Sequence, residues 1–71
     1  LVKLEREVSL ELAHARDAGP TDPRQRQQLS DAAELDSKGE QALKTGDYQT
    51  SYDDFLRARV MIRQIKTDRP L

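Results

Sequence analysis

Apolar residues recur about every three to four positions along three stretches of the chain, and polar residues fill the positions between them. This spacing is typical of amphipathic α-helices. The pattern predicts helices over about residues 1–18, 23–44 and 48–66. Short connections place successive helices antiparallel to one another. We therefore predict an all-α fold, a small up-down-up three-helix bundle that forms a single domain over residues 1–71.

The first predicted helix carries one apolar stripe. At about 100° per residue, five of its apolar side chains fall on the same side. These are Leu1, Leu4, Val8, Leu12 and Ala15. Val2 and Leu10 lie on other faces, so we expect them to be exposed. Gly19 and Pro20 then end the helix, because glycine accepts the left-handed conformation and proline cannot continue a helix.

The second predicted helix has a strong start signal and a glycine in its middle. Asp22 suits the N-cap, Pro23 suits the first helical position, and Gln25 completes a capping-box-like pattern. The inner arc consists of Leu29, Ala32, Leu35, Gly39, Ala42 and Leu43. Because Gly39 costs about 1 kcal/mol relative to alanine, we expect a neighbouring backbone or ring to approach it closely. Asp36 falls near this arc, either at its edge or paired with an arginine of the third helix.

The third predicted helix follows a turn at Gly46, with Asp47 as its N-cap. Its inner stripe consists of Tyr48, Ser51, Phe55, Ala58, Ile62 and Ile65. Acidic residues lie toward its start and arginines toward its end. This polarity complements the helix macrodipole, so it has a structural explanation before any functional one.

A second apolar stripe on the third helix is the most informative feature for function. Tyr52, Leu56 and Val60 recur at i, i+4 spacing and point away from the inner stripe. Either the first helix covers this stripe or the stripe stays open. An open stripe edged by Arg59 and Arg63 would form a groove for a partner helix or peptide. These five residues are the predicted binding site.

Composition narrows the class of protein further. The chain has 71 residues, no cysteine and a formal net charge of −1, with 35% of its residues charged. The charge balance argues against nucleic acid as a partner, and no apolar run is long enough for a membrane span or a signal peptide. From these absences we expect a cytoplasmic location. The chain begins at Leu1 within a helical pattern, so we expect it to be a fragment of a longer protein or to lack its natural start.

No residue pattern in the chain indicates catalysis. His14 is the single histidine and has no neighbour spaced as a metal ligand. Glu7 and Glu11, like Asp53 and Asp54, are paired carboxylates, but acid–base catalysis also needs a cleft, which a bundle of this size rarely has. We therefore predict a non-enzymatic protein with no catalytic residue, no metal site and no cofactor.

Residues 32–65 resemble one tetratricopeptide repeat. The matching positions are Leu35, Gly39, Gly46, Asp47, Tyr48, Ser51, Phe55 and Ala58. The resemblance implies a helical hairpin and a module for protein–protein interaction, with a protein or peptide as its partner. Since a solenoid needs about three repeats to bury its core, the first helix would replace the missing neighbour. An unrelated hairpin that has converged on the same packing is the other interpretation.

Two further hypotheses remain open from the sequence. Residues 40–47 are similar to the C-terminal helical lid of seventy-kilodalton heat-shock chaperones. This resemblance implies a lid or structural subdomain of a larger chaperone-like protein, with no site of its own. The exposed Val2 and Leu10 also allow the chain to self-associate through its first helix.

Overall fold

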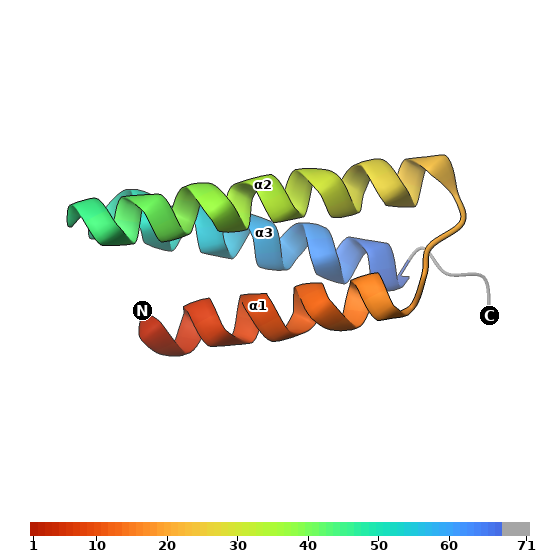
Figure 1. The fold of residues 1–71 in the computed structure, drawn as a ribbon, viewed down its shortest axis with the longest axis horizontal. Coiled ribbons are helices and arrows are strands. Elements are labelled where there is room, and N and C mark those ends of the chain that lie inside the picture. Colours follow the sequence, from red (N-terminus) through yellow and green to blue (C-terminus); the bar gives the residue numbers. More distant parts are fainter. Residues whose placement is uncertain (68–71) are drawn as a thin grey trace.

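The computed structural model describes the backbone of residues 1–67 and the side chains of residues 1–65. It consists of three helices, α1 (Val2–Asp17), α2 (Pro23–Thr45) and α3 (Tyr48–Thr67). The helices run up, down and up along a bundle with extents of 40 × 19 × 16 Å (Figure 1). No strand occurs in residues 1–67. The predicted all-α, three-helix fold is confirmed, and the predicted helix ends differ from these by one residue at most.

The residues that end one helix and start the next make the expected backbone contacts. The backbone N–H of Arg24 donates to Oδ1 of Asp22 over 2.9 Å, and Pro23 occupies the first turn of α2. Gly46 has φ of +84°, the left-handed conformation that ends α2. The N–H of Asp47 then donates to the carbonyl of Ala42, which together with the Gly46 N–H bond to Leu43 forms a Schellman motif. Local sequence therefore sets the position of this turn.

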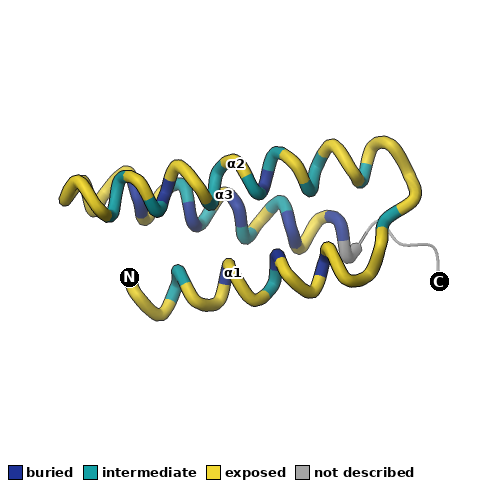
Figure 2. Tube along the Cα trace, in the orientation of Figure 1, coloured by how far each residue is buried: buried dark blue, intermediate teal, exposed yellow. Residues whose placement is uncertain are grey.

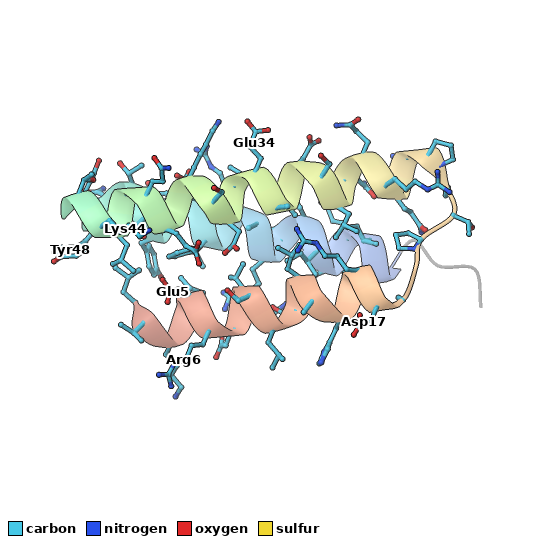
Figure 3. All side chains as sticks on the ribbon, in the orientation of Figure 1. Glu5, Arg6, Asp17, Glu34, Lys44 and Tyr48 are labelled. Carbon is cyan, nitrogen blue, oxygen red and sulfur yellow. The ribbon has the colours of Figure 1, made fainter. Side chains whose placement is uncertain are left out.

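One apolar core joins the three helices. Its buried apolar residues come from the predicted inner faces, and they are Val8, Leu12, Ala15, Ala32, Phe55, Ala58, Ile62 and Ile65. Figure 2 shows them along the inner side of each helix. Two predicted core positions are wrong. Leu1 is 39% exposed, because it precedes the first turn of α1, and Tyr48 is 61% exposed. The turn between α2 and α3 extends beyond the start of α1 (Figure 1), so α1 does not reach Tyr48 (Figure 3).

The contact between α2 and α3 depends on the missing side chain of Gly39. A Cβ atom at this position would lie 2.7 Å from Cε1 and 2.8 Å from Cδ1 of Phe55. Beside the ring, the buried hydroxyl of Ser51 donates to the carbonyl of Gly39 over 2.7 Å. Of the two neighbours expected for Gly39, a backbone or a ring, the structure has the ring. Small residues at these positions allow the two helices to pack closely around the Phe55 ring.

Candidate functional site

The second apolar stripe of α3 is largely open to solvent. Tyr52 is 49% exposed and Val60 is 54% exposed, while Leu56 between them is partly buried. The sequence left open whether the first helix covers this stripe. In the structure, α1 leaves most of it exposed. Tyr52, Leu56 and Val60 therefore form an accessible apolar row on the outside of the bundle.

The two arginines of the predicted site turn toward α1. Nη1 of Arg59 lies 3.6 Å from Oε2 of Glu7, and Nε of Arg63 lies 3.5 Å from Oε1 of Glu11. On a helical wheel, Arg59 falls between the stripe and the core, and Arg63 falls within the arc of the stripe, between Tyr52 and Leu56. Their first role in this structure is to hold α1 against α3.

A shallow hollow of about 440 Å³ lies where α3 meets α2. Its lining residues are Leu35, Leu56, Arg57, Val60, Met61 and Gln64. Leu35 belongs to α2 and the others to α3, so the hollow exists only because the two helices pack side by side. The stripe residues Leu56 and Val60 form part of its apolar floor.

A second, smaller hollow of about 280 Å³ lies where α3 meets α1. It is lined by Leu1, Lys3, Leu4, Glu7, Tyr52, Leu56 and Arg59. Leu56 borders both hollows, whereas Tyr52 borders only this one and Val60 only the first. Four of the five predicted site residues thus border two adjoining concave areas rather than one groove, and Arg63 lines neither of them.

Four residues of the larger hollow were not among the predicted site residues. Leu35 was assigned to the inner arc, Arg57 was explained by the macrodipole, and Met61 and Gln64 were assigned to no stripe. The sequence does carry a signal for the part of the hollow that α3 supplies. Leu56, Val60 and Gln64 recur at i, i+4 spacing, and Arg57 and Met61 each follow one position later, so all five lie on one side of the helix. The contribution of Leu35 from α2 has no such signal, because it depends on how the two helices are rotated against each other.

Asp36 lies at the edge of the core, where α2 faces α1. It is partly buried, and its Oδ1 atom is enclosed without a hydrogen-bond partner among the described residues. Burial raises the pKa of this carboxyl group, and the negative charges of Glu40 and Glu5 raise it further, while Arg16 acts in the opposite direction. The side chain of Glu5 is on the α2 side of α1 (Figure 3). The sequence left two alternatives for Asp36, a place at the edge of the inner arc or a pair with an arginine of the third helix. The structure has Asp36 at the edge, and the arginine that acts on it is Arg16 of α1.

The histidine and the carboxylates of the described residues do not form a metal site. His14 is exposed on α1. Among the residues that the structure describes, no group of three or more histidine, aspartate or glutamate side chains is placed to hold a metal ion. None of the helices, over the same residues, combines the length and the apolar character needed to span a membrane.

Comparison with known proteins adds no relative to this picture. No protein-family model, curated protein or solved structure matches the chain.

Proposed function

We propose that this chain is a non-catalytic protein–protein interaction module that contacts its partner through the open stripe of α3. The observation that carries this proposal is the exposure of Tyr52 and Val60 on either side of Leu56. The resemblance of residues 32–65 to a tetratricopeptide repeat supports the same function, since hairpins of that family bind protein or peptide partners.

Exposed apolar residues alone do not define a binding surface, because many soluble proteins have single apolar side chains in water. Here three of them follow one another at i, i+4 spacing, and each borders a concave area. Contiguous apolar surface with a polar rim is typical of sites for protein or peptide ligands. Arg59 borders the smaller hollow and belongs to this polar rim. Arg59 and Arg63 both pair with glutamates of α1.

The proposal can be tested by selecting binders from a randomised library of displayed helical peptides. Peptides selected on the wild-type chain are titrated against Val60→Asp and against Leu10→Asp. Leu10 is a matched control, because it is 58% exposed and Val60 is 54% exposed, on different helices. We expect Val60→Asp to lower the affinity at least about tenfold, equivalent to about 1.4 kcal/mol, and Leu10→Asp to have no effect. If no selected peptide depends on Val60, the proposal is wrong.

A structural subdomain of a larger chaperone-like protein is the second candidate function. The observation that favours it is the exposure of Val2 and Leu10, each 58% exposed on α1, outside the stripe of α3. In this case the partner is the rest of a larger chain. Self-association through α1 is a separate possibility that the same exposed residues allow. Sedimentation at two protein concentrations tests self-association, and Leu10→Asp would then abolish a concentration-dependent rise in mass.

A further inference from the structure

We infer that the hollow between α2 and α3 receives an amphipathic helix that carries a carboxylate within one turn of its apolar anchor, positioned to pair with Arg57. This inference rests on the proposed function and names the chemistry of the partner. It is built on four apolar side chains and one arginine at the larger hollow.

The floor of the hollow is apolar and is supplied by both helices. Leu35 comes from α2, and Leu56, Val60 and Met61 come from two successive turns of α3. Methionine and leucine side chains adapt to the shape of an apolar ligand more easily than β-branched or aromatic ones. A concave apolar floor of this kind suits one or two large aliphatic or aromatic side chains.

A helix suits this surface better than an extended peptide. An extended peptide on a shallow surface keeps its backbone N–H and C=O groups bonded to water, and it gains main-chain hydrogen bonds only where a strand edge can pair with it. The described part of the chain has no strand, and within α2 and α3 the backbone groups of the helix interiors already bond to one another. A helical partner satisfies its own backbone and presents only side chains to the floor.

The arginines of α3 indicate the sign of the charge that the partner carries. Glu7 and Glu11 neutralise Arg59 and Arg63 on the α1 side. Arg57, by contrast, makes no ion pair with any described residue and lines the hollow. Asp53 is one turn away at i, i+4 spacing and still makes no pair with it. Arg57 is therefore the cation available to a partner at this site.

The spacing along α3 restricts where the partner's carboxylate lies. Arg57 and Val60 are three residues apart, which places them about one helical turn from each other. If a partner helix places an apolar anchor against Val60, the residue one turn away from that anchor lies next to Arg57. This residue is three or four positions after the anchor or before it, depending on the direction of the partner helix. This predicts aspartate or glutamate at such a position.

The test uses the peptides that were selected on the wild-type chain and that lose affinity for Val60→Asp. We expect Asp or Glu to be enriched three or four positions from the large apolar residue. We also expect Arg57→Glu to lower the affinity of these peptides at least about tenfold, equivalent to about 1.4 kcal/mol. A peptide in which the acidic residue is changed to lysine should regain affinity for Arg57→Glu.

The matched control is Arg6→Glu, which changes the net charge by the same amount. Arg6 is exposed on the outer side of α1, away from the hollow (Figure 3). Circular dichroism of each variant verifies that the bundle is folded. Equal losses for Arg57→Glu and Arg6→Glu, or no enrichment of acidic residues, would overturn this inference and leave the proposed function standing. If none of the selected peptides depended on Val60, both the proposed function and this inference would be wrong.

Discussion

The two sides of α1 differ in the charges that they meet. On the side facing α3, Glu7 and Glu11 lie opposite Arg59 and Arg63. On the side facing α2, Glu5 acts on a partly buried Asp36 that already has Glu40 as a neighbour. Opposite charges thus draw α1 to α3. On the α2 side, the repulsion between Glu5 and Asp36 is opposed by the attraction between Arg16 and Asp36, so charge favours the contact of α1 with α3 more clearly than its contact with α2.

The contact between α2 and α3 is of a different kind. It is determined by shape, because the Phe55 ring occupies the space that a side chain at Gly39 would fill. Shape complementarity of this kind tolerates little change in volume, while exposed ion pairs contribute at most about 1 kcal/mol each. Substitutions at the two kinds of contact should therefore change the free energy of unfolding by different amounts, and these changes should depend differently on salt and pH.

The largest effect is expected for Phe55→Ala. Removing a fully buried aromatic side chain costs about 3–5 kcal/mol, and a domain of this size has few kcal/mol to lose. Thermal unfolding followed by circular dichroism should show a largely unfolded chain at 25 °C. Tyr48→Ala is the control, because it removes an exposed ring from the same helix and should change the stability by less than about 0.5 kcal/mol. Equal effects of the two substitutions would contradict this account of the core.

A smaller loss is expected for Gly39→Ala. The new methyl group must displace the Phe55 ring, which costs about 1–3 kcal/mol, while the higher helix propensity of alanine returns about 1 kcal/mol. We expect a net loss of roughly 1 kcal/mol in urea denaturation. In a Phe55→Leu background the methyl group has room, and Gly39→Ala should become neutral or stabilising. Additive effects in this double-mutant cycle would show that the ring and the glycine are not coupled.

Asp36→Asn should stabilise the chain at neutral pH. The folded state raises the pKa of Asp36, so its stability contribution is fully present below the unfolded pKa and is lost as the pH rises through the folded pKa. Asparagine cannot ionise, so it removes this loss, and we expect Asp36→Asn to be more stable than the wild type at neutral pH.

The measurement for Asp36 is the free energy of unfolding in urea, from acidic to neutral pH. We expect the difference between Asp36→Asn and the wild type to grow as the pH rises. Asp53→Asn is the control, because it removes one carboxylate from an exposed position of α3. A difference that shrinks with rising pH would mean that Asp36 is stabilised, not destabilised, by its surroundings.

The smallest effects are expected for the charges of α1 itself. Glu7→Gln and Glu11→Gln should each lower the stability by less than about 1 kcal/mol, and Glu5→Gln should raise it by a similar or smaller amount. Near 1 M salt, where the screening length is about 3 Å, these differences should shrink. Thermal unfolding at low and high salt provides the comparison. If Glu5→Gln and Glu11→Gln changed the stability in the same direction, the two sides of α1 would not differ in their electrostatics.

Local signals in the sequence determined the helices and their inner faces. Asp22, Pro23 and Gly46 mark helix ends because caps and turns depend on only a few neighbouring residues. The pairing of Gly39 with an aromatic ring also followed from the sequence, since a glycine in the middle of a helix indicates a close neighbour. The sequence did not decide whether the second stripe of α3 is exposed, because only another helix could cover it.

Only the tertiary structure decided how the faces of the three helices are shared. The lengths and offsets of the helices leave Tyr48 in solvent although its spacing fits the inner stripe. The rotation of α3 between its neighbours directs Arg59 and Arg63 to α1 and leaves Arg57 beside Leu35 of α2. Helical periodicity defines which residues share a face, but the partner of each face depends on side chains that are distant in the sequence.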